Sequence, residues 1–527
     1  MQTENGATQV NGTTTKAPIK FWTDEEGFAI SCIDRAIREQ GSPKKVVRTM
    51  DISEADVTYM DSEDKHFRDT HAKAPEMIGV WGKMKPNSMG SWCPYACKID
   101  SKKRTAIMYG FANHLFPGFG TDHPKSWLIP EETPELVQHM TETGAVIICK
   151  PNDGYCGAGI FIAQTVEDLK WVEGTTYICQ IYVNNPLTFG ERKRKIDYRF
   201  SFVNVDNKGE IGEVYYQTHN QGRVAVETFQ PLSKENKDDV TTHITFYPEL
   251  FSDPTKYIVT KDVENFSEVC NFQCWEQVCQ FYHSHGHPDF EKIMSERITT
   301  ISKKLQQIMR PFYKMVWAAK GITFTEKLNL TYANFFGSDV LIDEDYKCHV
   351  LEFNITPSCG DYIEAHGLEG EINPVFLKWG KEATELWFEM AKNKYDGVPF
   401  GEKQTIGSYQ KIFGSGIEAE YSEEGDTLEK LFNLFLKFVT GSPKLPEFDA
   451  EKMGERMWQE FWFPYIVERD QFIAGFRGLN TRVDESELVE FYEKFSVEEN
   501  GIYLLACAMC KLYTREECLD MLKRCDE

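Results

Sequence analysis

The chain has 527 residues, of which 41% are hydrophobic and 27% are charged, and this composition excludes a disordered or fibrous protein. At roughly 150 residues per domain, the length predicts about three to four domains. Asp and Glu outnumber Lys and Arg by 82 to 58, which gives a formal net charge of -24. A chain this acidic is not expected to bind nucleic acid or an anionic membrane surface, and any anionic ligand must be met by a local basic patch.

The first segment, residues 1–17, is rich in Thr, Asn, Gly and Gln, and we expect it to form a disordered tail. It lacks the apolar stretch of a signal peptide, and no run in the sequence reaches the roughly 18 to 20 apolar residues of a membrane span. Without a secretory signal, the 15 cysteines favour reduced thiols in a cytoplasmic protein.

Residues 18–105 are expected to form a small N-terminal α/β domain. Thr23 and Glu26 match a capping box at the start of a helix. Two short strand patterns follow at residues 45–50 and 57–59, and this alternation of helix and strand is typical of a compact α/β unit.

The middle of the chain carries the strongest strand patterns. One ends at Lys150, a second surrounds Gln180, a third begins at Tyr198 and a fourth begins at Val214. Each combines β-branched and aromatic residues, which favour a half-buried sheet surface.

A long helix and a hairpin are predicted next. The helix is indicated by apolar residues at helical spacing, namely Ile293, Ile298, Ile301, Leu305, Ile308, Phe312 and Met315. Residues 333–343 and 347–354 predict two strands joined by a polar turn at Glu344–Asp345. Residues 414–426 are rich in Gly and acidic residues and predict a linker, and residues 401–527 are expected to form a helical accessory domain.

A glycine-rich segment from Lys150 to Ile160 follows directly after a predicted strand. Gly154, Gly157 and Gly159 permit a tight backbone whose N–H groups point at an anion, and Lys150 adds a positive charge for a phosphate. The segment matches neither the Walker pattern nor the dinucleotide fingerprint, and a simple hairpin loop is the alternative.

Charged residues alternate along the strand that follows. Lys195, Asp197 and Arg199 share one strand face, which predicts a buried polar ligand or pairing with one another. An exposed edge strand is the alternative, and the basic run from Arg192 to Lys195 also allows a nuclear-localisation or nucleic-acid patch. Arg223, after the next strand, is by itself most typical of a surface residue.

Asp339, Glu352 and Asn354 lie on the two otherwise apolar strands of the predicted hairpin. Glu352 and Asn354 are two residues apart and share a strand face, and the hairpin can place Asp339 opposite them. Isolated carboxylates in such surroundings are costly unless they are paired or bind a metal. Hard oxygen donors in this arrangement suit Mg²⁺ beside substrate phosphates.

Taken together, these segments resemble the tubulin-tyrosine ligase family. The resemblance covers residues 19–395, and Glu352 follows Asp339 by 13 positions, as in the metal-binding motif of that family. The motifs that carry it are K-P-x-x-G-x-x-G-x-G-I from Lys150, Q-x-Y-V-x-x-P-L from Gln180, K-x-D-x-R from Lys195, Arg223, D-x-x-x-D from Asp339 and E-x-N-x-x-P-S from Glu352.

The resemblance implies a mixed α/β protein with an ATP-grasp fold. Residues 106–185 would form its central domain, and residues 186–400 would form its C-terminal domain with the metal site. It also implies an ATP- and Mg²⁺-dependent ligase that joins an amino acid to a protein carboxylate through an acyl phosphate, with tubulin or microtubules as the partner. Such an enzyme is expected in the cytoplasm, at the cytoskeleton or at the cilium.

The resemblance also implies a role for each site residue. Lys150, Cys156 and Gly157 would hold phosphates; Gln180, Ile181, Tyr182 and Val183 would contact adenine; Lys195 and Asp197 would lie at the ribose and phosphate end. Arg199 and Arg223 would be catalytic and face the γ-phosphate and the acyl phosphate, and Asp339, Glu352 and Asn354 would bind Mg²⁺.

Two positions depart from the family pattern. Phe246 stands where members carry an Asn near the nucleotide, and Ile355 stands where glutamate-adding members carry a His. The segment after Ile355 offers no equivalent of the Lys that holds the amino acid, and it is also unlike the tyrosine ligase. These departures leave the amino acid open and allow a non-catalytic tubulin-binding member as an alternative. A further alternative is an ATP-grasp ligase for a small peptide or metabolite, which the acidic net charge favours over tubulin.

An acidic tubulin tail would need a basic surface near the site. Arg192 to Lys195, with Lys303, Lys304 and Arg310 on the long helix, could supply it, and a solvated helix face is the alternative for the helix residues.

Two cysteine-rich segments allow either a zinc site or a buried helix face. The first contains Cys270, Cys274, Cys279, His283, His285 and His287, and the second contains Cys507, Cys510, Cys518 and Cys525. Apolar neighbours favour the helix face in both, since free Cys behaves as a small hydrophobic residue. A calcium loop around Gly501 lacks its bidentate Glu, because position 507 is Cys, and a capping box from Ser496 to Glu499 explains the same residues.

Overall fold

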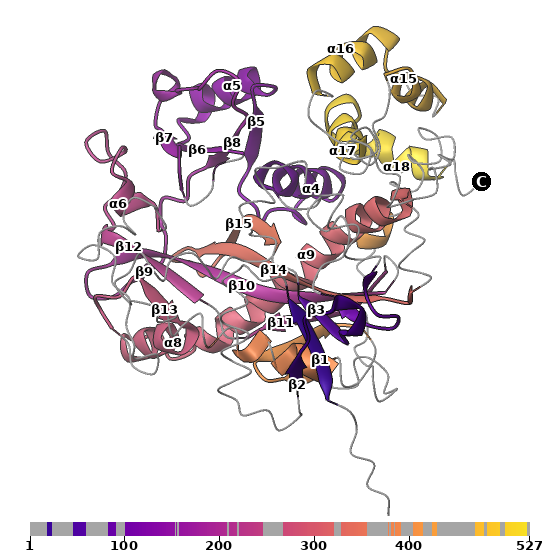
Figure 1. Cartoon of the computed structure of the whole chain (residues 1–527). Coiled ribbons are helices and arrows are strands. Elements are labelled where there is room, and N and C mark those ends of the chain that lie inside the picture. Colours follow the sequence, from indigo (N-terminus) through magenta and orange to yellow (C-terminus); the bar gives the residue numbers. More distant parts are fainter. Residues whose placement is uncertain are drawn as a thin grey trace, which may run out of the picture.

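The structure, a computed structural model of the chain, describes residues 18–23, 46–59, 83–90, 101–152, 154, 157–207, 210–218, 221–245, 267–320, 328–355, 378, 381–383, 385–390, 404–414, 424–428, 430, 469–478, 482–495 and 501–523. The predicted tail at 1–17, the helix predicted after Thr23 and most of the predicted linker at 414–426 lie outside these residues. The described part is mixed α/β, as predicted, with two sheets and the helices that pack on them (Figure 1).

The larger sheet contains 13 strands among the described residues. They are β1 (Ile19–Thr23), β2 (Val46–Arg48), β3 (Val57–Tyr59), β4 (Met89–Gly90), β9 (Thr188–Phe189), β10 (Arg194–Asn207), β11 (Glu210–Gln217), β12 (Gln221–Thr228), β13 (Phe272–Cys274), β14 (Thr331–Ile342), β15 (Cys348–Ile355), β16 (Thr405–Ile406) and β17 (Tyr409–Phe413). The main path runs β16-β17-β11-β10-β14-β4-β3-β1-β2. Strands β9 and β12 also pair with β10, β13 pairs with β12, and β15 pairs with β14.

Strands β10 and β14 form the centre of the large sheet. They pair in antiparallel register from Asp197 opposite Leu341 to Asp206 opposite Tyr332. Strand β14 is buried along almost its whole length, as expected for an apolar run with neighbours on both sides. It forms the predicted hairpin with β15, and β10 and β11 are the strands predicted from Tyr198 and Val214.

The smaller sheet has four antiparallel strands in the order β5-β8-β6-β7. These are β5 (Ser126–Ile129), β6 (Ile147–Pro151), β7 (Phe161–Ala163) and β8 (Tyr177–Ile181), and helix α5 (Thr133–Thr143) packs against them. Strands β6 and β8 are those predicted at Lys150 and Gln180, and they are neighbours, with Lys150 opposite Ile178. The small sheet stands above the β14–β15 hairpin in the view of Figure 1.

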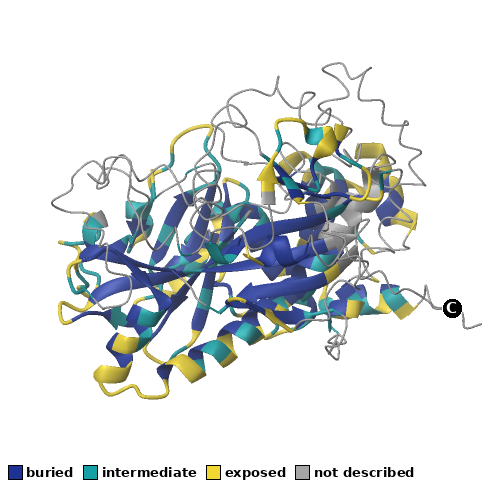
Figure 2. Ribbon diagram, turned by 60° about the horizontal axis from the view of Figure 1, so that its bottom comes forward, coloured by how far each residue is buried: buried dark blue, intermediate teal, exposed yellow. Residues whose placement is uncertain are grey.

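The other named helices are α4 (Lys102–Leu115), α6 (Val240–His243), α8 (Trp275–Ser284), α9 (Phe290–Lys320), α15 (Arg469–Gly478), α16 (Glu485–Phe495), α17 (Gly501–Leu512) and α18 (Arg515–Lys523). Helix α9 is the predicted amphipathic helix, and Ile298, Leu305 and Ile308 on one of its faces are buried. Buried residues gather in the strands of the large sheet, whereas exposed residues lie on the outer faces of the helices (Figure 2). No described helix combines the length and the apolar character needed to cross a bilayer.

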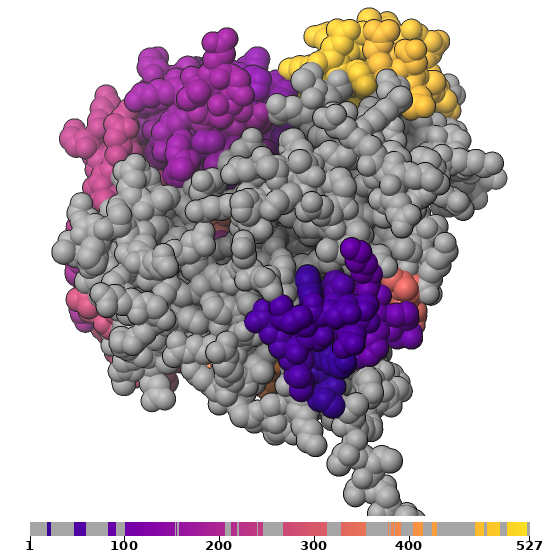
Figure 3. Space-filling view, in the orientation of Figure 1, coloured from indigo at the N-terminus to yellow at the C-terminus, as the bar shows by residue number. Residues whose placement is uncertain are grey.

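The sheet does not follow the domain boundaries expected from the sequence. Strands β1 to β4, from the expected N-terminal domain, join the large sheet through β14. Strands β16 and β17 fall in the range 401–527, which was expected to be helical, but β17 pairs with β11. Helix α17 packs on α4 and α9, where Tyr503 stacks on Phe312 at 5.2 Å between ring centroids. Figure 3 shows the N-terminal strands, the small sheet and the C-terminal helices on one face of the molecule.

Candidate functional site

Four adjacent strands of the large sheet carry one row of charged side chains. Asp197 lies opposite Arg223, Arg199 lies opposite Asp339, and Asp339 lies opposite Glu352. Residues directly opposite each other in antiparallel strands point to the same face, so the register of β12, β10, β14 and β15 brings together residues far apart in sequence. Strand β10 has partners on both edges, so the exposed-edge alternative for its charged residues is wrong.

Ion pairs hold the middle of this row. Arg199 binds Asp339 with two hydrogen bonds, Nε to Oδ1 at 2.7 Å and Nη2 to Oδ2 at 2.8 Å. Arg223 lies between two acids: its Nη2 is 2.9 Å from Asp339 Oδ2, and it also pairs with Asp197. Arg223 is buried, so the interpretation of this residue as a surface arginine is wrong. Burial raises the pKa of Asp339, but the two guanidinium groups outweigh burial and hold that pKa well below its ordinary value.

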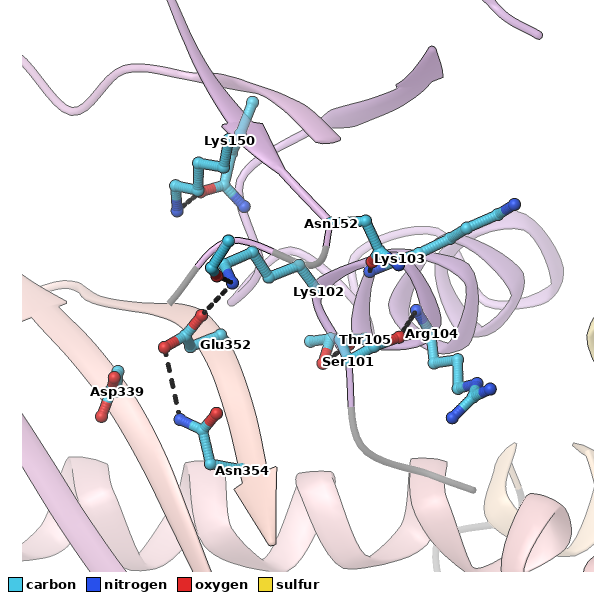
Figure 4. A network of polar contacts seen from close by, with 12 residues as sticks. Ser101, Lys102, Lys103, Arg104, Thr105, Lys150, Asn152, Asp339, Glu352 and Asn354 are labelled. Atoms are coloured by element: carbon cyan, nitrogen blue, oxygen red, sulfur yellow. Dashed lines mark hydrogen bonds and ion pairs between the residues drawn. The ribbon is translucent and has the colours of Figure 1, made fainter. Parts of the chain in front are cut away.

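Glu352 and Asn354 form the outer, half-exposed end of the row on β15. Asn354 Nδ2 donates to Glu352 Oε1 at 3.3 Å, and Glu352 Oε2 is 3.5 Å from Lys102 Nζ (Figure 4). Asp339 lies directly opposite Glu352, and the three side chains offer carboxylate and amide oxygens of the kind that Mg²⁺ prefers. The donor set therefore fits a magnesium ion, provided that Lys102 and Asn354 Nδ2 give up their contacts with Glu352.

Two buried lysines lie near the row. Lys150, on β6 of the small sheet, donates from Nζ to Gln180 Oε1 at 2.9 Å. Lys195, on β10, donates to the carbonyl oxygen of His243 at 3.0 Å and to the hydroxyl of Tyr182 at 3.3 Å. Burial lowers the pKa of Lys150 to about 8 and that of Lys195 to about 7, although nearby carboxylates partly oppose the shift.

The described part of this site holds more positive than negative groups. Its cations are Lys102, Lys150, Lys195, Arg199 and Arg223, and its carboxylates are Asp197, Asp339 and Glu352. A chain with a net charge of -24 thus concentrates an excess of positive charge at one place. Such an excess, largely shielded from water, is suited to a multiply charged anion.

The glycine-rich loop joins β6 to β7, so it is a hairpin loop in topology. Gly157 and Gly159 have φ angles of 79° and 72°, which favour glycine. A Cβ atom on Gly154 would lie 2.9 Å from the carbonyl oxygen of Ala158. The loop is therefore built for glycine and packs closely on itself. Cys156 lies outside the described residues.

Sequence reasoning missed Lys102, at the start of α4. Its Nζ donates to the carbonyl oxygen of Gly154 at 2.5 Å as well as facing Glu352, so it connects the glycine-rich loop to β15. In Figure 4 the neighbouring Lys103 and Arg104 point away from Glu352. The signal in the sequence was the basic run after Ser101, whose side chain caps this helix.

Sequence reasoning also missed His123, in the segment between α4 and β5. Its ring is buried, with Nδ1 2.8 Å from the carbonyl oxygen of Val350 and Nε2 3.2 Å from Gln180 Nε2. Burial lowers its pKa to about 4, so the imidazole is neutral near neutral pH. A single histidine in an irregular segment gives no pattern from which this contact could have been predicted.

The residues predicted to contact adenine line the end of β8. The N–H groups of Ile181 and Tyr182 donate to the carbonyl oxygens of Lys125 and Val146, and Val183 is half-buried. Those two N–H groups are therefore already used within the protein. Phe246, the departure from the family pattern, lies outside the described residues.

The alternative sites do not come together among the described residues. Cys270 and Cys274 are buried, whereas His285 and His287 are exposed and contact Glu191 and Tyr346. No three His, Cys, Asp or Glu side chains of the described part converge as a metal site. Cys507 and Cys518 are buried, Cys510 is partly buried, and Cys525 and the segment from Ser496 to Glu499 lie outside the described residues.

The basic run at Arg192 to Lys195 is not a continuous surface patch. Arg194 and Lys195 are buried, and the exposed Arg192 pairs with Glu227 at 2.9 Å. The nucleic-acid interpretation of this run is therefore wrong. On α9, Lys304 Nζ is 2.9 Å from Asp122 Oδ2, which leaves the exposed Lys303 as the stronger candidate for contact with an acidic partner.

Comparison with known proteins supports the resemblance. Tubulin polyglutamylase TTLL6 of Homo sapiens is 26% identical over 250 residues, 46% of this chain and 26% of the relative. A probable beta-tubulin polyglutamylase of Tetrahymena thermophila is 24% identical over 298 residues, 55% of this chain and 23% of the relative. For tubulin polyglutamylase ttll-4 of Caenorhabditis briggsae, the identity is 25% over 295 residues, 53% of this chain and 45% of the relative.

The matched region spans about a quarter of the length of the first two relatives. A sequence model of the tubulin-tyrosine ligase family matches residues 97–366, which is more than half of this chain and includes every residue of the candidate site. The chain therefore belongs to the tubulin-tyrosine ligase family.

Proposed function

We propose that this chain is an ATP- and Mg²⁺-dependent ligase with an ATP-grasp fold, which joins an amino acid to a carboxylate of tubulin. The observation that supports this most strongly is the excess of cations, largely shielded from water, beside the oxygen donors Asp339, Glu352 and Asn354. A triphosphate with a divalent ion keeps a net negative charge and needs both kinds of group at once.

The chemistry follows from the poor reactivity of a carboxylate. The γ-phosphoryl group moves from ATP to a carboxylate oxygen, so the P–O bond to the leaving ADP breaks, a new P–O bond forms, and the acid becomes an acyl phosphate. The amine nitrogen then attacks the acyl carbon, the C–N bond forms, inorganic phosphate leaves and the amine loses a proton. Bound Mg²⁺ would neutralise charge on the transferring group. This scheme needs no Ser, Cys or His nucleophile in the protein.

Each site residue has a proposed part in this scheme. Lys150, Gly157 and Cys156 hold phosphates, and Lys102 joins them because it already bridges the glycine-rich loop and Glu352. Gln180 to Val183 face adenine, and Lys195 and Asp197 lie toward the ribose and phosphates. Arg199 and Arg223 stabilise the transferring group, and their ion pairs with Asp339 fix their orientation before the ligand arrives.

Tubulin is proposed as the partner because the relatives are named as tubulin polyglutamylases. Glutamate is accordingly the first amino acid to test, although Ile355 departs from the pattern of glutamate-adding members. A tubulin substrate would place the protein at the cytoskeleton or the cilium. Charge reversal of Lys303 and Lys304 should lower turnover on tubulin without changing ATP binding if this helix face contacts the acidic tail.

The decisive experiment incubates the full chain with tubulin, Mg·ATP and one labelled amino acid at a time. We expect label in tubulin with release of ADP and phosphate. Glu352→Gln should abolish incorporation while leaving the thermal unfolding midpoint within a few degrees, because glutamine keeps the size of a half-exposed side chain.

Two outcomes would contradict the proposal. Absence of incorporation together with absence of Mg·ATP binding heat, in a chain that still sediments with microtubules, would favour the non-catalytic member that Phe246 and Ile355 allow. Incorporation into a small peptide or metabolite but not into tubulin would favour the third hypothesis.

A further inference from the structure

Four side chains and one carbonyl group form a hydrogen-bonded chain that connects the two sheets. It begins at the carbonyl oxygen of Val350 on β15, two residues before Glu352, and passes through His123 and Gln180 to Lys150. Ser126 Oγ lies beside this chain, 3.1 Å from His123 Nε2 and 3.3 Å from Gln180 Nε2, and it donates to the carbonyl oxygen of Pro124 at 2.8 Å. The chain thus links the strand of the candidate metal site to the lysine of the glycine-rich loop.

The chemistry of the two ends fixes the direction of every hydrogen bond in between. A carbonyl oxygen only accepts, so His123 Nδ1 must carry the proton that Val350 receives. A neutral imidazole then has Nε2 as its acceptor, so the amide nitrogen of Gln180 must face it. This leaves Gln180 Oε1 toward Lys150, whose ammonium only donates. With the Ser126 hydroxyl donating to the carbonyl oxygen of Pro124, this arrangement satisfies the imidazole, the amide and the ammonium together.

The backbone holds His123 firmly in this place. The residue before it, Asp122, accepts a hydrogen bond at its carbonyl oxygen from Val350 N at 2.7 Å. The N–H group and the carbonyl group of Val350 are thus both hydrogen-bonded to the segment that carries His123. The ring also stacks on Tyr109 of α4, with 5.2 Å between centroids and 25° between planes. The imidazole therefore has little freedom to rotate.

We propose that His123 is a positioning residue that sets the orientation of the Gln180 amide and so keeps an acceptor in front of the Lys150 ammonium. This inference rests on the proposed function, in which Lys150 holds a phosphate. Without an acceptor at position 123, the Gln180 amide can rotate and turn its NH₂ group toward the lysine, which removes the hydrogen bond from the buried ammonium to Gln180 Oε1.

The test is the pH dependence of Mg·ATP binding, measured by calorimetry on the full chain in a Lys195→Arg background, which removes the titration of the other buried lysine. Two cations, Lys102 and Lys195, lie near Lys150. The nearby anions are Glu352, Asp339 and Asp197. In His123→Phe, the Mg·ATP affinity should begin to fall at a pH about one unit lower than in the protein with His123. Above that pH, the affinity of the variant should be about tenfold weaker. His123→Gln, which can donate and accept, should restore the original profile.

The matched control is His139→Phe, the same substitution in the small sheet's helix α5. The His139 ring packs on Trp127 at 4.8 Å and takes no part in the chain of hydrogen bonds. This control should leave the pH profile in place. A profile that is unchanged in His123→Phe, even with a lower unfolding temperature, would overturn the inference and reduce His123 to a packing role.

A second measurement is made on the wild-type protein without nucleotide and uses a variant only to assign the signal. Ring-nitrogen chemical shifts of His-labelled wild-type protein should identify a neutral His123 with its proton on Nδ1, assigned by loss of the signal in His123→Gln. A proton on Nε2, or a charged ring at pH 7, would contradict the proposed direction of the chain. Absence of Mg·ATP binding in the wild type would instead contradict the proposed function, and the tautomer measurement would still stand.

Discussion

Two groups of largely buried charges differ in balance: one lies between two strands of the large sheet, and the other joins the large sheet to Lys102 of α4 and Lys150 of the small sheet. Between β11 and β17, Lys411 faces Glu213 at 2.5 Å, one cation against one carboxylate, with both side chains almost fully buried. At the candidate site, five cations lie around three carboxylates. The first group is neutral as a pair, whereas the second keeps positive charge that the described residues do not neutralise.

This difference separates a structural role from a binding role. A buried ion pair between two strands holds them together, and its loss is expected to appear in stability. A cluster with excess charge is costly for the folded chain alone, and this cost is recovered when an anion binds. The two groups should therefore respond in opposite ways to the removal of one lysine.

The largest expected effect is on stability at the balanced pair. Lys411→Met leaves Glu213 buried without its cation and should lower the free energy of unfolding by about 3–5 kcal/mol, measured in urea. The double variant Lys411→Met with Glu213→Met should recover most of this loss. Mg·ATP affinity of the folded variant should be unchanged. A change in the free energy of Mg·ATP binding as large as the change in the free energy of unfolding would show that this ion pair and the candidate site are not independent.

Removal of Lys150 should give the opposite result. Lys150→Met should weaken Mg·ATP binding by about 10- to 100-fold, since a charged hydrogen bond to phosphate is lost. The free energy of unfolding at pH 7 should stay the same or rise by about 1 kcal/mol, because the buried ammonium, whose pKa burial lowers to about 8, no longer has to be held charged. Calorimetry and urea unfolding of the same sample check both signs, and a large loss of stability would contradict the contrast.

A smaller effect is expected on the pH dependence of binding. Burial lowers the pKa of Lys195 to about 7, so this lysine loses its proton, and its attraction for phosphate, as pH rises through 7 rather than near 10.5. Wild-type affinity for Mg·ATP should therefore fall from pH 7 upward. The arginine of Lys195→Arg stays charged over this range. The ratio of its Mg·ATP affinity to that of the wild type should therefore rise about tenfold between pH 7 and pH 9. The ratio at each pH cancels the titration of the nucleotide, and a ratio independent of pH would refute the prediction.

Much of this fold could be predicted because its strands and its long helix are marked by local patterns. The hairpin of Asp339 and Glu352 was predicted from a polar turn and two apolar runs, and its register places Asp339 opposite Glu352, whereas Asn354 lies opposite Gly337. Strands β16 and β17 were missed, because they are short, lie beside a linker-like segment and gain their stability from β11, far away in sequence.

The site was predicted less completely for the same reason. Arg223 looks like a surface residue in its own segment, and its burial follows from a pairing with β10 that places Asp197 and Asp339 around it. Lys102 and His123 act through Glu352 and Val350, which are more than two hundred residues away. No local pattern carries such contacts, so these residues could be identified only from the fold.

The smallest effect tests whether burial, rather than pairing itself, decides the strength of these charge contacts. The pair Lys304–Asp122 has nearly the geometry of a buried pair, at 2.9 Å, but 29% of the lysine side chain is exposed. Water already solvates part of this charge, so Lys304→Ala should lower the free energy of unfolding by less than about 1 kcal/mol, and by less still in high salt. Lys303→Ala, at the neighbouring exposed position, is the control and should have no measurable effect. A loss of unfolding free energy in Lys304→Ala as large as that in Lys411→Met would contradict this expectation. It would mean that the segment of Asp122 and His123 is held in place by the Lys304–Asp122 pair as well as by its two hydrogen bonds to Val350.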